Sequence, residues 1–330
     1  MPFSSLIGHR PLVALLRQAV ARGRVPQSLL FAGPEGVGKR EAALALAQAV
    51  NCPSRKDGDA CGSCATCRRI AQGTHSDVVM LDKGDEASIK IRALRERVLD
   101  VVGYRPFEAV RRVFIIDPAD ELTVEAQDAL LKTLEEPPPS AILVLVASYP
   151  DTLLPTIQSR CRRLRFGPLA EADVARVLAE REGVPLTKAR VLAAGSGGSV
   201  ARALADEDGA LADDRDAALG VLRAARAPAV GPRLKAATTL GQHGSKRRDR
   251  EALDARLAAL ASLTRDLGAI ASGTSAPLAN VDLGDTLRDL AASFDAGRVD
   301  AAYETVVQAR RALDRNASPK IVADWLAVRL

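Results

Sequence analysis

The stretch that decides the fold is Ser28-Leu-Leu-Phe-Ala-Gly-Pro-Glu-Gly-Val-Gly-Lys-Arg40. It has the order of a short apolar strand, a glycine-rich loop and the start of a helix, which is the context of a phosphate-binding loop. The GxxxxGK pattern of such loops is met by Gly33, Gly36, Gly38 and Lys39. In this arrangement backbone N–H groups and a helix N-terminus surround phosphates, while the lysine neutralises their charge. These four residues are the candidate nucleotide-binding residues.

The position after the lysine departs from the pattern. Ser or Thr normally stands there and its hydroxyl helps to hold Mg²⁺, but this chain has Arg40, which cannot be a metal ligand. A second apolar run ends in Asp117, as expected for an aspartate that would hold Mg²⁺. Pro118 follows in place of the glutamate that usually activates water. We therefore predict that the chain does not hydrolyse ATP, whereas binding of nucleotide without turnover stays open.

Four of the five cysteines lie within sixteen residues: Cys52, Cys61, Cys64 and Cys67. In a chain without secretory features such a cluster indicates metal binding rather than disulfides. Four thiolates on tight turns are the ligand set of a closed, tetrahedral zinc site, which predicts a structural Zn²⁺. The alternative is a set of reduced thiols without a ligand. His75, eight residues downstream, is interpreted as an exposed loop residue rather than a ligand.

The alternation of apolar runs and helical patterns predicts an α/β fold with a parallel sheet covered on both faces. The expected strands are 29–32, 77–81, 111–117, 141–147 and 162–166. The expected helices in this part are 11–23, 40–50, 88–103 and one from Thr123 to the prolines at 137–139. Two short helices, 170–182 and 186–194, follow, and from 208 the pattern is helical throughout.

The bulk composition is that of an ordinary soluble protein. The 330 residues are 47% hydrophobic and 26% charged, and the net charge of +5 is compatible with an acidic partner without requiring one. No apolar run approaches the roughly 20 residues of a membrane span, and the N-terminus lacks an apolar signal core. These features predict a cytoplasmic protein with no membrane partner.

The order of motifs resembles the clamp-loader subunits of bacterial DNA polymerase III, which belong to the AAA+ superfamily. The motifs are GPEGVGK, CxxCxxC, VFIIDPAD, AQDALLKTLEEPP, LPTIQSRC and GSGGSVARAL, between about residues 3 and 205. The resemblance implies a RecA-like AAA+ domain over 1–166 with a zinc module near 51–75. It further implies a helical lid over 167–207 and an all-α collar domain over 208–330.

The family contains motor ATPases (gamma/tau) and a delta-prime subunit that is generally not an ATPase. With Arg40 and Pro118, this chain resembles delta-prime. The resemblance implies that Arg160, within Ser159-Arg160-Cys161, reaches in trans into the ATP site of a neighbouring motor subunit. The implied partners are gamma/tau and delta subunits in a hetero-oligomeric ring, the sliding clamp and primed DNA. Arg202 lies one place later than the lid arginine of the motors, so its role as a nucleotide sensor stays open.

Two other functions are compatible with the sequence. One is a motor ATPase of the gamma/tau type with an unusual phosphate loop, which Arg40 and Pro118 together disfavour. The other is a zinc-dependent DNA-binding protein, which is disfavoured because the cysteine segment lacks interleaved aromatic and dense basic residues. The leading hypothesis is a non-hydrolysing subunit of the polymerase holoenzyme.

Overall fold

The first part of the chain folds around a five-stranded sheet. The computed structural model describes residues 1–330 except 87, 206–209, 227–228, 241–245, 275–277 and 315–316, and the chain divides into two compact units, Met1–Pro168 and Leu169–Leu330. The strands of the sheet are β1 (Ser28–Ala32), β2 (Val78–Leu81), β3 (Arg112–Ile116), β4 (Ala141–Ala147) and β5 (Arg162–Arg165). Their spatial order is β2-β3-β4-β1-β5 and all pairs are parallel.

The central strands are apolar because both faces of the sheet are covered. All seven residues of β4 are buried, as are all five of β1, which pairs with β4 from Ser28 opposite Leu143 to Ala32 opposite Ala147. A strand buried on both faces reads as a continuous apolar run rather than an alternation. Because β3, β4 and β1 are adjacent and parallel, their carboxyl ends lie side by side at one edge of the sheet.

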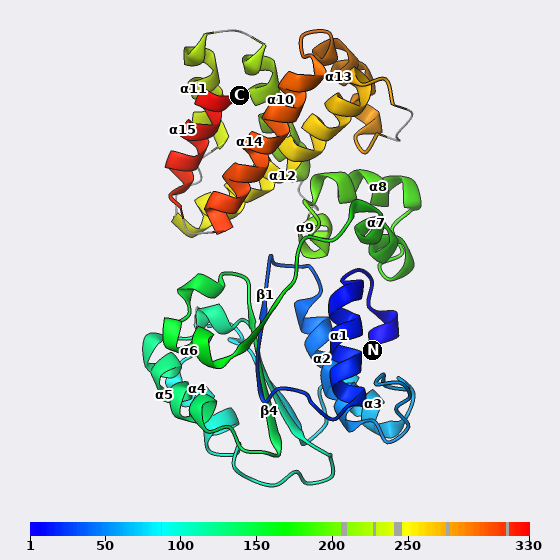
Figure 1. The fold of residues 1–330 in the computed structure, drawn as a ribbon, viewed down its shortest axis with the longest axis vertical. Helices are drawn as coiled ribbons and strands as arrows, with labels where there is room; N and C mark the ends of the chain where they lie inside the picture. The colour runs from blue at the N-terminus through cyan, green and yellow to red at the C-terminus, as the bar shows by residue number, and fades with distance from the viewer. Residues whose placement is uncertain (87, 206–209, 227–228, 241–245, 275–277, 315–316) are drawn as a thin grey trace. The chain divides into compact units, whose positions relative to one another are not determined.

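Helices cover both faces of the sheet (Figure 1). They are α1 (Arg10–Ala21), α2 (Lys39–Asn51), α3 (Ala65–Ala71), α4 (Ile91–Leu94), α5 (Val124–Glu135) and α6 (Pro155–Arg160). Figure 1 shows α1 to α3 on one face and α4 to α6 on the other. On the latter face Leu130 and Leu134 of α5 pack in one cluster with Leu30, Phe114 and Leu143 of the sheet. The predicted α/β class and the parallel sheet covered on both faces are confirmed.

One expected element is wrong: residues 88–103 do not form a single helix. Helix α4 covers only Ile91–Leu94 and continues as a π-helical turn over Arg95–Leu99. The cause lies at Ile89, whose N–H donates to Glu121 O and whose carbonyl accepts from the Thr123 N–H. This residue is extended and bridges to the segment before α5, so the helix begins only after it.

The second unit is helical in all the elements that the structure describes. Its helices are α7 (Glu171–Glu180), α8 (Leu186–Gly195), α9 (Val200–Leu204), α10 (Ala210–Ala225), α11 (Val230–Leu240), α12 (Lys246–Ala271), α13 (Gly284–Ala291), α14 (Ala296–Asp314) and α15 (Pro319–Arg329). One apolar core joins α10 to α15, with the long helix α12 contributing Leu253, Leu257, Leu260, Leu263 and Leu267. The expected boundary between lid and collar at 207/208 falls outside the described residues. No described helix has the length and apolarity needed to cross a membrane.

Candidate functional site

The phosphate loop joins the end of β1 to the start of α2 and depends on its glycines. Gly36 and Gly38 have φ angles of 70° and 97°, which L residues with side chains rarely adopt. At Gly33 a Cβ atom would lie 2.0 Å from the carbonyl oxygen of Phe166, so a side chain cannot be placed there. The structure thus brings all four candidate residues of the GxxxxGK pattern into one turn at the edge of the sheet.

Lys39 is buried in this loop and its ammonium group is fully engaged. Nζ donates to Gly33 O at 2.7 Å, to Pro34 O at 2.6 Å and to Ser148 Oγ at 3.2 Å. Burial lowers the pKa of Lys39 to about 8, although the carboxylates of Asp117 and Asp120 act in the opposite direction. Since an ammonium has three N–H donors, a phosphate entering the loop must replace at least one of these bonds.

Arg40 lies against the aspartate that was expected to hold a metal ion. Its Nε is 3.6 Å from Asp117 Oδ2, and Nη2 is 3.9 Å from Asp82 Oδ2. Burial raises the pKa of Asp117, while Arg40 and Lys39 lower it. A guanidinium therefore supplies positive charge at the carboxylate where a divalent cation would otherwise do so.

Asp120 is a carboxylate close to Asp117, two residues beyond Pro118. Asp120 accepts the backbone N–H groups of Ser148 (3.2 Å) and Tyr149 (2.8 Å) with Oδ2, so its carboxylate is bound to the end of β4. Ser148, which contacts Lys39, was not among the predicted site residues. The available signal was its place directly after an apolar strand, at the edge where the phosphate loop lies.

The four clustered cysteines come together as the spacing predicts. Their Sγ atoms all lie within 4.8 Å of one another, and Cys52 Sγ is 3.9 Å from Cys64 Sγ. Four sulfur atoms at about 2.3 Å from a tetrahedral ion would be separated by about 3.8 Å, so the donor set fits such an ion. The backbone N–H groups of Cys61, Cys64 and Cys67 each point at the sulfur of the preceding cysteine of the set, at 3.3 to 3.4 Å. The backbone N–H groups of Ser63 and Cys64 lower the pKa of the Cys61 thiol to about 6, which favours the thiolate form that binds metal.

The cysteine segment is fixed to the start of the chain. The buried carboxylate of Asp59 accepts the N–H groups of Phe3 at 2.7 Å and Ser4 at 2.9 Å. Gly58 is required beside it, because a Cβ atom there would lie 2.0 Å from Arg17 O of α1. The segment between α2 and β2 is therefore an integral part of the first unit rather than a loose insertion.

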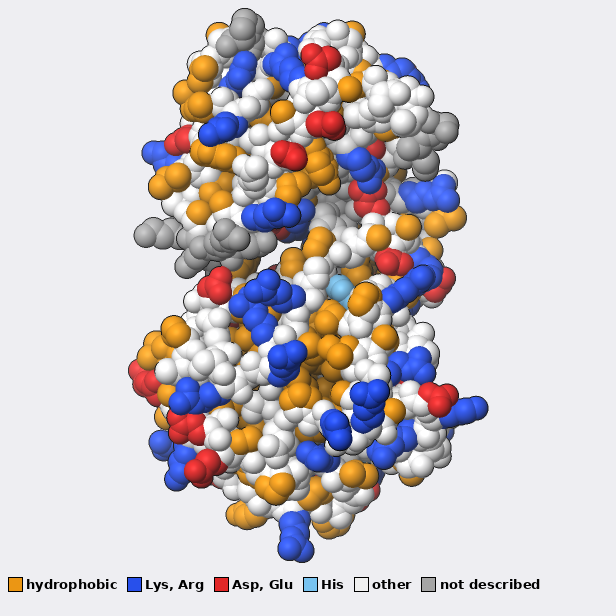
Figure 2. Space-filling model, in the orientation of Figure 1, with side chains coloured by type: hydrophobic (Ala, Val, Ile, Leu, Met, Phe, Trp, Pro, Cys, Tyr) orange, Lys and Arg blue, Asp and Glu red, His pale blue; other side chains and the backbone are white. Residues whose placement is uncertain are grey.

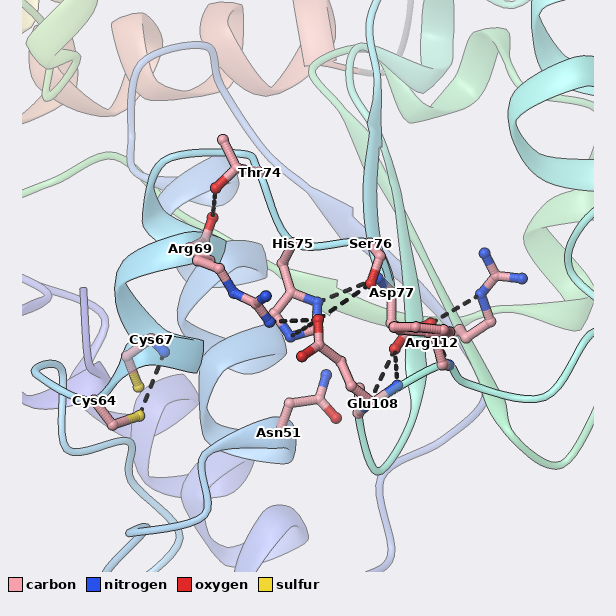
Figure 3. Close-up of polar contacts among 12 residues, drawn as sticks. Asn51, Cys64, Cys67, Arg69, Thr74, His75, Ser76, Asp77, Glu108 and Arg112 are labelled. Atoms are coloured by element: carbon pink, nitrogen blue, oxygen red, sulfur yellow. Dashed lines mark hydrogen bonds and ion pairs between the residues drawn. The ribbon is translucent and has the colours of Figure 1, made fainter.

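His75 is not an exposed loop residue, so that prediction is wrong. Its side chain is buried between α3 and β2, and Nε2 lies 3.8 Å from Glu108 Oε1, which also pairs with Arg69 (Figure 3). Burial lowers the pKa of His75. The residue lies apart from the four cysteines and completes a polar network at the beginning of β2.

Asp77, next in this network, holds the segment before β3. Its carboxylate accepts the N–H groups of Phe107, Glu108 and Ala109 at 2.9 to 3.0 Å (Figure 3). Arg112 Nε lies 3.6 Å from the same carboxylate. Burial alone would raise the pKa of Asp77, but the three N–H groups and Arg112 hold it below its ordinary value.

Arg160 is the last residue of α6. Its Nη1 donates to Thr156 O at 3.0 Å and to Ser159 Oγ at 3.4 Å, and Nη2 donates to Glu135 Oε1 at 2.7 Å. The side chain is 34% exposed, so an anion outside the chain can reach it. Cys161 is buried in the core beside it, and burial raises the pKa of its thiol to about 12, so it is a packing residue.

The comparison with known families covers most of the chain. A family described as "DNA polymerase III, delta subunit" matches residues 8–170, and one described as "DNA polymerase III, delta subunit, C terminal" matches residues 246–321. The chain belongs to this family of DNA polymerase III subunits. The match includes the phosphate loop, the cysteine cluster and Arg160.

Individual members of the polymerase III subunits show the same relationship. The tau subunit of Bacillus subtilis is 36% identical over 165 residues, which are 50% of this chain and 29% of tau. The gamma/tau subunit of Mycobacterium tuberculosis H37Rv is 35% identical over 204 residues, or 59% of this chain and 35% of its own length. The delta' subunit of Pseudomonas aeruginosa is 39% identical over 151 residues, 45% of each chain. The chain thus spans less than half the length of these curated relatives, which include both kinds of subunit.

Solved structures give a weaker likeness. A gamma-subunit-related protein of Thermotoga maritima aligns over 96% of this chain and 97% of its own at 18% identity, with a TM-score of 0.39.

In this member of the family, Arg202 is bound within the second unit. Its Nη2 donates to Asp254 Oδ2 of α12 at 3.1 Å, and Arg310 of α14 donates to the other oxygen at 3.2 Å. Burial would raise the pKa of Asp254, but the two arginines hold it below its ordinary value. Arg202 therefore has a structural contact that a role as nucleotide sensor would have to break.

Proposed function

We propose that the chain is a non-hydrolysing, delta-prime-type subunit of the DNA polymerase III clamp loader. The observation that carries the proposal is the contact between Arg40 and Asp117, 3.6 Å apart, beside Pro118. A cation built into the chain competes with Mg²⁺ at this carboxylate, and proline has no group that activates water. A motor ATPase of the gamma/tau type needs both Mg²⁺ at this carboxylate and a group that activates water. The chain's own loop is then a degenerate nucleotide site.

The role of this subunit would lie in Arg160. Its guanidinium stands at the end of α6, is partly exposed and is already oriented by three hydrogen bonds. An arginine supplied in trans stabilises charge on the γ-phosphate during hydrolysis. Arg160 would complete the ATP site of a neighbouring gamma/tau subunit in a ring that also holds delta, and would thereby support loading of the sliding clamp onto primed DNA in the cytoplasm.

We also propose that Cys52, Cys61, Cys64 and Cys67 hold one structural Zn²⁺. All four sulfurs would be ligands, so no coordination position remains for a substrate. The ion would stabilise the segment that Asp59 joins to the start of the chain. A zinc-dependent DNA-binding protein is the less supported alternative, because the cysteine segment lacks interleaved aromatic and dense basic residues. On the face drawn in Figure 2, Lys and Arg side chains of the first unit lie among hydrophobic and uncharged ones.

The test is ATP hydrolysis by an assembly reconstituted from this chain, its motor and delta subunits, the clamp and primed DNA. Arg160→Ala is expected to fold normally and to lower the DNA-stimulated rate severely, because arginine fingers contribute factors of about 10³ or more at the site they complete. The purified chain alone is expected to show no turnover. Turnover that Lys39→Ala abolishes would identify a motor ATPase instead, and a fully active Arg160→Ala assembly would contradict the trans role.

A further inference from the structure

Two side chains of helix α5 form hydrogen bonds with the two ends of helix α6. Near the start of α5, the buried Gln127 accepts the N–H of Leu154 at 2.8 Å with Oε1, and donates to Leu122 O at 3.2 Å with Nε2. Leu154 directly precedes α6. At the other end, Glu135, the last residue of α5, accepts from Arg160 at 2.7 Å. Gln127 thus fixes where α6 begins, and Glu135 fixes the side chain with which it ends.

The contact with Glu135 does not use up the guanidinium. Arginine has five N–H donors, and the described residues accept three hydrogen bonds from Arg160, at Thr156, Ser159 and Glu135. Two N–H groups are left for an anion outside the chain. The side chain of Arg160 is therefore held in place and is still able to bind a phosphate oxygen.

The place of Glu135 strengthens this contact. A carboxylate at the C-terminal end of a helix adds to the negative end of the helix dipole, so this end of α5 attracts a guanidinium. Arginine also loses much conformational freedom when it is ordered, and a partner that orders it beforehand removes that cost from the later binding step. Pre-orientation of this kind increases the rate of a step that needs the side chain in one place.

We infer that Glu135 is the positioning residue of Arg160, which holds the guanidinium against α5 in the orientation that the neighbouring subunit's ATP site requires. The inference rests on the proposed trans role of Arg160. Glu135 would touch no nucleotide itself and would act only through the arginine.

The test uses the reconstituted assembly with Arg160→Ala, Glu135→Ala, Glu135→Gln and the double variant. Both partners are partly exposed, with 34% and 50% of the side chain accessible, and ion pairs of this kind are weak. Glu135→Ala is therefore expected to lower the maximal DNA-stimulated rate about two- to fivefold, with the half-saturating ATP concentration unchanged. Glu135→Gln keeps an oxygen acceptor and should recover part of the rate. The double variant should equal Arg160→Ala.

Glu136→Ala is the matched control, since Glu136 is the exposed neighbour and should leave the rate unchanged. Normal activity of Glu135→Ala beside an inactive Arg160→Ala would overturn the positioning role and leave the trans role intact. A faster Glu135→Ala assembly would mean that the ion pair keeps the arginine away from the ATP site, which would also contradict the positioning role. A further loss in the double variant would show that Glu135 acts elsewhere. Full activity of Arg160→Ala would overturn both proposals.

Discussion

The Nε atom of Arg40 lies 3.6 Å from Oδ2 of Asp117. Arg40 follows Lys39 at the start of α2, whereas Asp117 is the residue that follows β3. Arg40 also donates to Met80 Sδ from Nε and Nη2, at 3.1 and 2.7 Å. These contacts place the guanidinium over the edge of the sheet where the phosphate loop opens. A nucleotide at this loop would meet an arginine in the region where other phosphate loops hold Mg²⁺.

Arg40→Thr is expected to make nucleotide binding dependent on Mg²⁺. The variant removes the competing charge and restores the hydroxyl that helps to hold the ion. Titration of the purified chain with a fluorescent ATP analogue should show binding at least about tenfold tighter in Mg²⁺ than in EDTA, which corresponds to about 1.4 kcal/mol. Hydrolysis should stay absent because Pro118 has no acid–base group. Arg92→Thr, on an exposed helix residue, is the control, and an Arg40→Thr chain indifferent to Mg²⁺ would contradict the prediction.

Cys64→Ser is expected to abolish metal binding and lower the melting temperature. Elemental analysis should find about one zinc per wild-type chain and little in the variant, because a closed site needs all four thiolates. Cys161→Ser is the matched control: this buried cysteine lies outside the cluster, so the variant should lose some stability but keep its zinc. A wild-type chain that contains no metal and is as stable as Cys64→Ser would disprove the zinc site.

Asp77→Asn is expected to destabilise the first unit by about 2–4 kcal/mol, since it breaks a buried contact with Arg112 and three N–H bonds to a charged acceptor. The pKa of Asp77 is lowered on folding, so its contribution is present above about pH 4, the value of an unfolded aspartate, and is lost as the pH falls through the folded value.

Urea unfolding at a series of pH values measures this contribution. The difference between wild type and Asp77→Asn should be largest near neutral pH and should shrink below about pH 4. Asp128→Asn, at an exposed position of α5, should change stability by no more than about 0.5 kcal/mol. An equal difference at every pH would show that the carboxylate charge of Asp77 contributes nothing.

Lys39→Met provides a second pH-dependent comparison, in which the stability of the wild type again rises with pH but in a more alkaline window. The folded pKa of Lys39 is about 8, below the 10.5 of a free lysine, so between these values the unfolded chain binds more protons. Stability of the wild type should therefore rise with pH in this window, relative to Lys39→Met, by about 2–3 kcal/mol. Below about pH 7, where Lys39 is protonated in both states, the difference should be constant. The titration of the other lysines is the same in both proteins and cancels in the difference. A difference in stability that stays flat from pH 8 to 10.5 would contradict the burial of a charged Lys39.

The elements that were predicted well are those whose pattern is local. The run Ala141–Ala147 is a strand over the residues expected, because a strand buried on both faces is apolar throughout. The GxxxxGK pattern and the four cysteines also carry their geometry in their spacing, so the phosphate loop and the sulfur cluster form as expected.

The errors concern residues whose structure is decided by distant parts of the chain. Ile89 has a helical pattern around it, but its backbone bonds to residues 121 and 123, which the pattern does not reveal. His75 lies between turn residues and is nevertheless buried, because α3 and Glu108 cover it. The partner of Arg160 could not be predicted either, since Glu135 lies 25 residues earlier and each is an ordinary charged residue at a helix end.

The two contacts of α5 also limit how the sequence of this helix can change in evolution. Gln127 and Glu135 are eight residues apart, about 12 Å along the axis, and both meet the segment that ends at Arg160. A single inserted or deleted residue between them would turn one contact by about 100° and shift it by about 1.5 Å relative to the other. We therefore expect gaps among homologues to fall outside this helix, because a change in its length would break one of the two contacts.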